Sequence, residues 1–143
     1  MKVLALGLAA LAIGVALGLA AGATAIPPGP ASIKVTLHLE KTTGANGRIT
    51  RVFKVFNRPA YQGPIGDAVM VCIPARASLA ACRLYTSLRR GQITFDGLVS
   101  SFGFYRLAVT GGTGYYDTVG GSAVFGRINN SSVWSVVIDL QGF

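Results

Sequence analysis

The segment from Ala108 to Gly126 (AVTGGTGYYDTVGGSAVFG) constrains the fold of this chain most strongly. A glycine-rich loop binds phosphate chiefly when a helix begins directly after it and supplies free N–H groups. The residues that follow these glycines are aromatic and β-branched and have no helical period. The segment therefore predicts strands, in which glycines mark bulges and the sharp bends that let a sheet close into a barrel. We expect this structural role for Gly111, Gly112, Gly114, Gly120 and Gly121.

The rest of the chain from residue 32 onward also consists of short strand-like segments separated by turns. Residues 32–41 alternate apolar and polar side chains with a period of two, which indicates a strand with one buried face. Further strands are predicted at residues 48–57, 67–73, 82–89, 92–100, 102–110, from Tyr115 or Gly121 to Ile128, and 133–140. Eight such strands in sequence favour an all-β fold, an eight-stranded antiparallel β-barrel formed by residues 32–143 as a single domain.

The N-terminal residues 1–25 have the pattern of a secretory signal peptide. A positive Met1-Lys2 start precedes an apolar run, and Ala23-Thr24-Ala25 fits the cleavage rule for small residues. An uncleaved membrane anchor is the alternative, but the cleavage site favours removal. Residues 26–31 then form an extended, proline-rich leader. We therefore expect a secreted protein, extracellular or in the cell envelope, that begins at Ile26.

The only two cysteines, Cys72 and Cys82, are predicted to form a disulfide, because an exported chain meets an oxidising environment. Such a bridge would join two strand-like segments and fix a hairpin. A reactive thiol is the rival interpretation, but no histidine or metal ligand lies nearby in the sequence.

The chain is basic, with 13 Lys and Arg residues against 5 Asp and Glu residues. Apart from Arg89-Arg90 these basic residues are dispersed, and no basic helix or base-stacking motif accompanies them, so no nucleic-acid partner is expected. A basic surface on an exported protein instead predicts contact with acidic glycans or envelope polymers. Asn129 and Asn130 each begin a glycosylation pattern, which matters only in a host that glycosylates.

Chemistry-bearing side chains are few. The one histidine, His38, lies on the polar face of the first strand beside Glu40. The pair has the groups for acid–base work, but a lone histidine on such a face is more often an ordinary hydrogen-bonding residue. One histidine and two paired cysteines cannot form a metal site, and no nucleophile motif is present. No cofactor and no metal are expected.

The motif AVTGGTGYYDTVGG resembles the signature of the allene oxide cyclase-like barrel superfamily, which includes the plant dirigent proteins. The resemblance implies an eight-stranded antiparallel barrel with a central cavity and a homo-oligomer, a dimer or trimer. Several strands here are apolar on both faces, notably residues 52–56 and 133–140, which also favours self-association.

The catalytic side chains of dirigent proteins are not retained. In those that form lignans, an Asp commonly follows the GGT triplet and an Arg precedes the closing glycine, whereas these positions are Gly114 and Gly120 here. Their first strand carries a His-Asp pair, where this chain has His38-Leu39-Glu40. The acid is therefore either absent or shifted by one residue, and a shift of one residue on a strand turns a side chain to the opposite face. Asp117 lies near these positions in the sequence but matches neither of them.

Three functional hypotheses remain. The first is a barrel that binds a small apolar or phenolic ligand in its lumen, and the second is an isomerase-like cyclase or dirigent-type stereochemical guide. The third is a non-catalytic structural or cell-surface-binding protein. Strand alternation places Arg106 either in the lumen or in solvent, and a luminal Arg106 would need Asp96 or Asp139 as its partner. The ligand-binding candidates from the sequence are His38, Asp96, Arg106, Tyr116 and Asp139.

Overall fold

The computed structural model describes residues 32–58, 63–76, 78–100 and 103–142 of the 143-residue chain. The predicted signal peptide and leader lie outside these residues. The described chain is all-β and contains eight strands: β1 (Ser32–Ala45), β2 (Arg48–Asn57), β3 (Pro64–Arg76), β4 (Leu79–Leu88), β5 (Gly91–Ser100), β6 (Phe104–Gly114), β7 (Gly120–Arg127) and β8 (Val133–Gln141). No helix within the described residues is long and apolar enough to cross a membrane.

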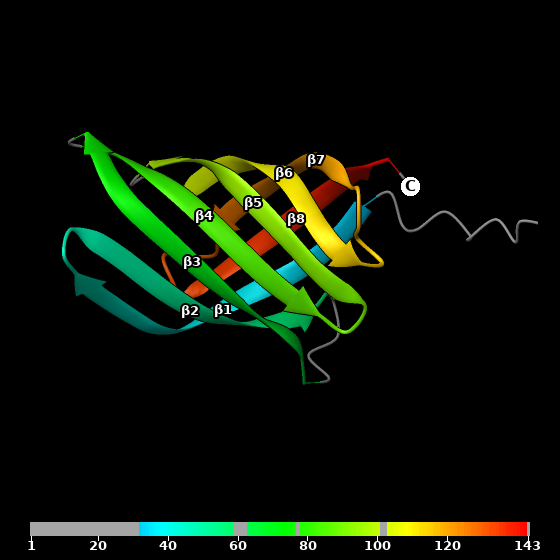
Figure 1. Cartoon of the computed structure of the whole chain (residues 1–143). Coiled ribbons are helices and arrows are strands. Elements are labelled where there is room, and N and C mark those ends of the chain that lie inside the picture. The colour runs from blue at the N-terminus through cyan, green and yellow to red at the C-terminus, as the bar shows by residue number, and fades with distance from the viewer. Residues whose placement is uncertain (1–31, 59–62, 77, 101–102, 143) are drawn as a thin grey trace, which may run out of the picture.

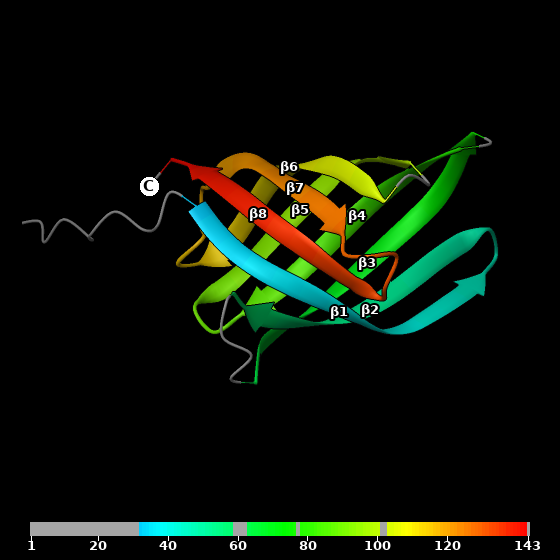
Figure 2. The ribbon, with the colours of Figure 1, turned by 180° about the vertical axis from the view of Figure 1, so that it is seen from behind.

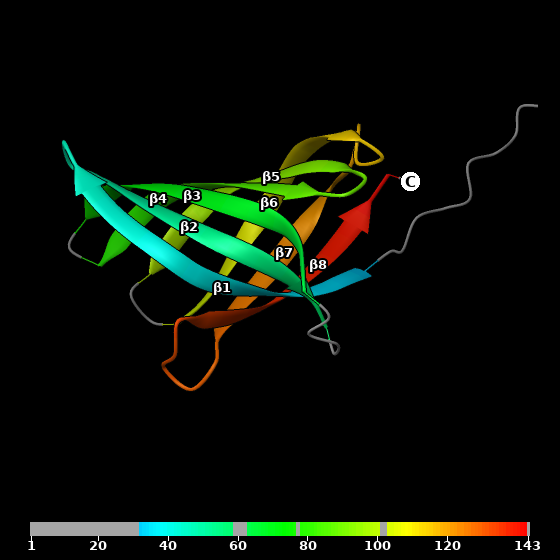
Figure 3. The same cartoon turned by 90° about the horizontal axis from the view of Figure 1, so that it is seen from below.

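The strands form one closed antiparallel barrel in sequence order, which confirms the predicted fold class. Each strand pairs with its neighbours in the chain, and β1 closes the barrel against β8 from Ser32 opposite Asp139 to His38 opposite Val133. Figures 1 and 2 show the two sides of this barrel. The β1–β2 and β3–β4 hairpins project beyond the other strands at one end, as Figure 3 shows from below. We call this the hairpin end.

Strand alternation sorts the side chains into a packed interior and a polar exterior. On β6, Tyr105, Leu107 and Val109 are buried while the residues between them are exposed. The same period of two recurs on the other strands. Because strand side chains point alternately to the two faces, this pattern follows directly from the sequence. The interior of the barrel is the hydrophobic core of the molecule.

The glycine-rich segment contains a β-bulge and several backbone conformations that favour glycine. A register shift makes Thr110 an extra residue between the Phe95–Val109 and Thr94–Gly111 pairs, so β6 carries a β-bulge there. Gly111, Gly114 and Gly121 have positive φ. Gly112 does not, but a Cβ placed on it would collide with the carbonyl oxygens of Tyr116 and Gln92. Gly112 therefore lets the β6–β7 turn fold against the barrel, whereas Gly120 has neither a positive φ nor a close neighbour.

Several strands extend beyond the segments that apolar periodicity indicates. β1 continues to Ala45, and β3 and β4 reach Arg76 and Leu79, because ladder pairing there holds exposed or half-buried residues that show no regular apolar alternation. β6 likewise runs through the glycines to Gly114 instead of ending at Thr110. Polar and glycine-rich strand ends carry no periodic signal, so the sequence underestimates their length.

The disulfide between Cys72 and Cys82 is present and confirms the predicted pairing. The two residues lie directly opposite each other on β3 and β4, and both side chains are buried on the luminal side. The bridge therefore fixes the β3–β4 hairpin close to the hairpin end of the barrel.

We expect Gly112→Ala to lower the free energy of unfolding by about 2–4 kcal/mol, because the new Cβ overlaps backbone oxygens that cannot move without displacing the turn. Gly120→Ala is the matched control, since a Cβ there meets nothing within 4 Å. Chemical denaturation of both variants measures the difference. Equal stabilities would contradict the steric role of Gly112.

Candidate ligand-binding site

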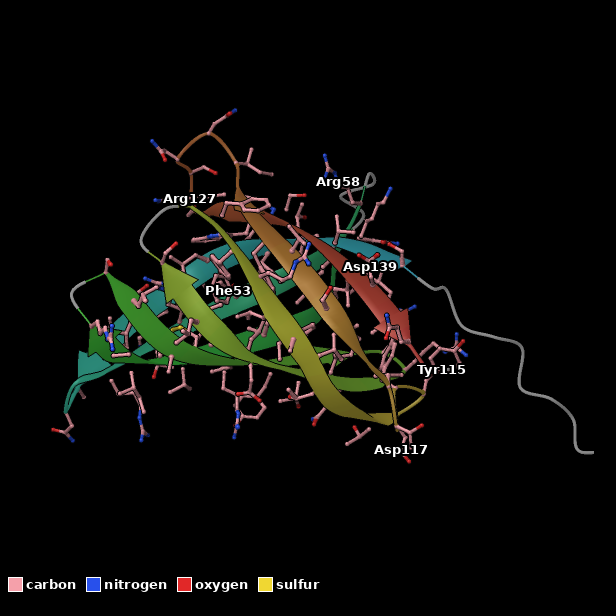
Figure 4. All side chains as sticks on the ribbon, turned by 90° about the horizontal axis from the view of Figure 1, so that it is seen from above. Phe53, Arg58, Tyr115, Asp117, Arg127 and Asp139 are labelled. Carbon is pink, nitrogen blue, oxygen red and sulfur yellow. A yellow bond between two sulfur atoms is a disulfide. The ribbon has the colours of Figure 1, made fainter. Side chains whose placement is uncertain are left out.

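Three of the residues singled out from the sequence lie on the outside of the barrel. Arg106 is exposed on the outer face of β6, so of the two alternatives for this residue the solvent-facing one holds. Asp96 accepts hydrogen bonds from Arg83 Nε at 2.6 Å and from Thr110 Oγ1 at 3.0 Å, and the Arg83 bond lowers the pKa of its carboxyl group. Asp139 is exposed on β8 (Figure 4). The pairing of Arg106 with either acid is predicted only for a luminal Arg106 and so does not apply here.

His38 also lies outside the lumen, half-buried on the outer face of β1. Its ring lies 4.4 Å from the ring of Phe56, centroid to centroid, on the neighbouring strand. Thr36 lies two residues earlier on the same outer face. It is buried although it does not point into the lumen. This part of the outer wall is therefore packed, and a ligand-binding role for His38 stays a prediction.

Tyr116 lies in the β6–β7 turn and closes the end of the barrel opposite the hairpin end. Tyr116 and Val119 are buried there, and the turn is held by hydrogen bonds from the Tyr116 and Asp117 amides to the carbonyls of Thr113 and Gly114. Figure 4 shows Tyr115 and Asp117 at this end and Arg127 at the opposite end. Burial raises the pKa of the Tyr116 hydroxyl. Tyr116 thus acts as part of a plug in this structure.

A cation–π contact fixes the plug from outside. The Arg90 guanidinium carbon lies 3.5 Å from the centre of the Tyr115 ring, and the Tyr115 amide donates a hydrogen bond to the Arg90 carbonyl. Tyr115 in turn packs edge-on against Tyr116. The β4–β5 turn therefore supports the β6–β7 turn, and this end of the lumen is closed.

The middle of the lumen is filled by aromatic side chains. Phe53, visible inside the barrel in Figure 4, meets Trp134 edge-on at 5.4 Å between ring centroids. Phe125 is stacked on Tyr105 at 5.0 Å and meets Phe95 edge-on at 6.1 Å. An eight-stranded barrel has an interior just wide enough to be filled in this way. A ligand site must therefore lie toward the hairpin end.

A pocket of about 260 Å³ opens at the hairpin end, on the luminal side of the wall. Most of its lining comes from inward-facing positions of four neighbouring strands, β2 to β5, and Ser78, Leu79 and Ser100 also line it. Its apolar lining includes Ile49 from β2, the Cys72–Cys82 disulfide, Ala80 from β4 and Val99 from β5. We call this space the mouth pocket. The disulfide, which the sequence predicts only as a hairpin staple, forms part of its wall.

Two arginines give the mouth pocket its charge. Arg51 lies on β2 in the same inward-facing row as Ile49 and Phe53, and Arg76 lies near the end of β3. Arg51 acts electrostatically on Tyr105, whose buried hydroxyl has its pKa raised to about 12 by desolvation while the Arg51 charge opposes that rise. Sequence reasoning missed Arg51, although its even spacing from Phe53 and Val55 was the available signal.

A metal-based or acid–base site is not evident in the described part of the chain. No group of three His, Cys, Asp or Glu side chains there could hold a metal ion. Of the described residues that line the mouth pocket, none carries a carboxylate or an imidazole. The pocket offers guanidinium donors and an apolar wall.

Comparison with known proteins shows the fold. No family model matches the chain, and no curated protein sequence matches it. Among solved structures, a pyocyanin demethylase superposes with a TM-score of 0.64 at 15% identity, over 77% of this chain and 99% of that one. The Diels–Alderase AbmU from Streptomyces koyangensis superposes with a TM-score of 0.62 at 15% identity, over 78% of this chain and 64% of that one.

A dirigent protein is also among the similar structures. The pterocarpan synthase dirigent protein GePTS1 superposes with a TM-score of 0.60 at 11% identity, over 76% of this chain and 85% of that one. The chain thus shares its barrel fold with a dirigent protein, as the resemblance of the glycine motif implies. At these identities the likeness shows the fold alone.

The buried Tyr105 hydroxyl makes stability sensitive to high pH. Its pKa is ordinary, near 10, in the unfolded chain and about 12 in the barrel, so the folded state holds the proton more tightly. Its contribution is complete below pH 10 and is lost as pH rises to 12, about 2–3 kcal/mol in all. Tyr105→Phe should flatten the decline measured by denaturation across this range, whereas Tyr85→Phe, at an exposed position, should not. Parallel declines in both variants would contradict the assignment.

Proposed function

We propose that this chain binds a small apolar or aromatic molecule in the mouth pocket. The observation that carries the proposal is the pocket itself, a hollow on the luminal side with a largely apolar wall, whose polar side chains are two arginines and two serines. Ligand sites in proteins typically combine an apolar lining with a few placed polar groups, and the mouths of β-barrels are among their usual positions. The volume of about 260 Å³ restricts the ligand to a small one.

The structural neighbours support small-molecule binding by analogy. They are described as a pyocyanin demethylase, a Diels–Alderase and a pterocarpan synthase dirigent protein. Barrels of this shape are therefore used elsewhere for chemistry on small organic molecules. Fold analogy alone does not transfer a reaction, so the substrate must be argued from the side chains of this chain.

The side chains favour binding or conformational guidance over acid–base catalysis. Tyr105 stays neutral at physiological pH, and Arg51 stays charged, so neither is suited to exchange a proton near pH 7. What the pocket can supply is shape, an apolar wall and a fixed positive charge. A cyclase or dirigent-type role would accordingly consist of holding a reactive molecule in one conformation.

A structural or surface-binding barrel is the second candidate, favoured by the packed middle of the lumen. The aromatic cluster around Phe125 leaves the central interior filled. Dispersed exposed arginines and lysines on the outer wall would then be the working surface, with acidic glycans or envelope polymers as partners.

Filling the mouth pocket tests the binding proposal. Calorimetric titration of the wild-type protein with octanol and with cinnamyl alcohol should show saturable binding. Ala80→Trp places a large ring into the pocket and should weaken that binding at least about tenfold, by steric exclusion. Ala108→Trp adds the same ring on the exposed outer face of β6 and should bind as wild type. Circular dichroism checks that both variants fold.

The absence of saturable binding to wild type would overturn the proposal and favour the structural barrel. Equal binding by Ala80→Trp would instead exclude the mouth pocket as the site.

We also propose that the chain is exported and self-associates. The outer face of β3, β4 and β5 supports self-association, because a hollow of about 610 Å³ there is lined by the exposed apolar residues Ile73, Tyr85 and Leu98. Exposed apolar patches commonly mark contact surfaces, and in a symmetric dimer or trimer each copy would present this face. The Arg83–Asp96 ion pair within the hollow offers both charges to a second copy.

Native mass spectrometry of protein recovered from its secretion medium tests export and assembly together. We expect a chain that begins at Ile26, carries no alkylatable thiol before reduction, and runs as a dimer or trimer. Leu98→Asp should shift the assembly to monomers, because it puts a charge into an apolar contact, whereas Lys34→Asp, on the exposed outer face of β1 outside the hollow, should not. A mass that includes residues 1–25, or a monomeric wild type, would contradict the respective part.

A further inference from the structure

The arginines of the mouth pocket have no carboxylate partner within the described chain. All five Asp and Glu side chains lie in the described residues, and only two of them form ion pairs, Lys54–Asp67 at 2.5 Å and Arg83–Asp96 at 2.6 Å. Both pairs lie on the outer wall. The described residues that line the mouth pocket include Arg51 and Arg76 and no acid.

The position of Arg51 is unusual for an unpaired cation. Arginines of the outer wall such as Arg106 and Arg48 are exposed, whereas Arg51 is half-buried and belongs to the inward-facing row of β2. A guanidinium carries five N–H donors in a planar fork, and its charge is fixed at all physiological pH values. Turned toward an apolar pocket with no acid beside it, this group has donors available for a ligand.

The field of Arg51 reaches the interior. Its charge acts on the buried Tyr105 hydroxyl, which lies on β6 within the luminal row. Arg76 extends the positive field to the outer part of the pocket, near the end of β3. An anion approaching from the hairpin end would therefore meet Arg76 first and Arg51 further in.

We propose that the mouth pocket selects small organic acids, with Arg51 binding the carboxylate and Arg76 drawing the anion in. The apolar or aromatic body of the acid lies against Ile49, Val99 and the Cys72–Cys82 disulfide. This inference rests on the proposed function and adds the head group of the ligand to it. Bidentate pairing of a guanidinium with a carboxylate gives both geometry and charge to the contact.

Matched ligands separate the head group from the body. Octanoate and octanol share the tail, and cinnamate and cinnamyl alcohol share the aromatic body, so each pair differs only in the acid. At pH 7.5 and low salt, calorimetry should show each acid binding wild type at least about tenfold more tightly than its alcohol, the scale of a charge-assisted hydrogen bond. Octyl sulfate is the third arm, and tighter binding of the sulfate than of octanoate would overturn the carboxylate assignment.

Variants assign the selectivity to its residues. Arg51→Gln should remove at least about tenfold of octanoate affinity and should lower octanol affinity far less, because the alcohol carries no charge for the guanidinium to bind. Arg76→Gln should cost less, about two- to threefold, and its effect should shrink as salt screens the charge. Arg106→Gln removes an exposed arginine from the outer face and should change neither ligand.

The outcomes distinguish this inference from the proposed function. Binding of octanol and octanoate with equal affinity would overturn the acid selectivity while the binding function stands. An equal loss in Arg51→Gln and Arg106→Gln would show a general charge effect and would overturn the role of Arg51. Binding of neither ligand would overturn the proposed function itself.

Discussion

The filled lumen is the constraint on which the rest of this molecule depends. Closing eight strands leaves an interior that side chains must occupy, and Phe53, Phe95 and Phe125 occupy it. The two exposed cross-strand ion pairs on the outer wall contribute little by comparison, because water screens the attraction between exposed charges. Stability therefore comes from the packed interior, and within the lumen only the hairpin end is left for a ligand.

The two ends of the barrel differ because the local sequences that form them differ. At one end Gly112 lets the β6–β7 turn fold inward, so Tyr116 and Val119 close the lumen. At the other end the long β1–β2 and β3–β4 hairpins extend the wall (Figure 3). The mouth pocket lies on the inner side of this wall. The asymmetry arises from turn length and glycine placement rather than from the core.

The fold could be predicted from the sequence to a greater extent than the site. Alternation in residues 32–41 and the glycine motif lead to a closed barrel, because period-two patterns and bends are local properties. Alternation also divides the residues of a strand into two sets, but it does not say which set faces inward. For Arg106 that choice depended on Tyr105 and Leu107, which fill the lumen. The mouth pocket is lined by residues of β2 and β5, which are not neighbours in the barrel. No local sequence pattern encodes how these two strands are placed relative to each other.

The pairing of β1 with β8 has a consequence for how the chain reaches this state. Every other ladder joins neighbouring strands, so it can form soon after its second strand emerges. The edge of β1 that pairs with β8 stays unpaired until β8 has been synthesised. Until then it presents unpaired N–H and C=O groups to any other chain. Removing β8 would not give a smaller barrel but a curved open sheet with two adhesive edges. The nine-residue strand β8 thus converts an aggregation-prone open sheet into a closed barrel without free edges.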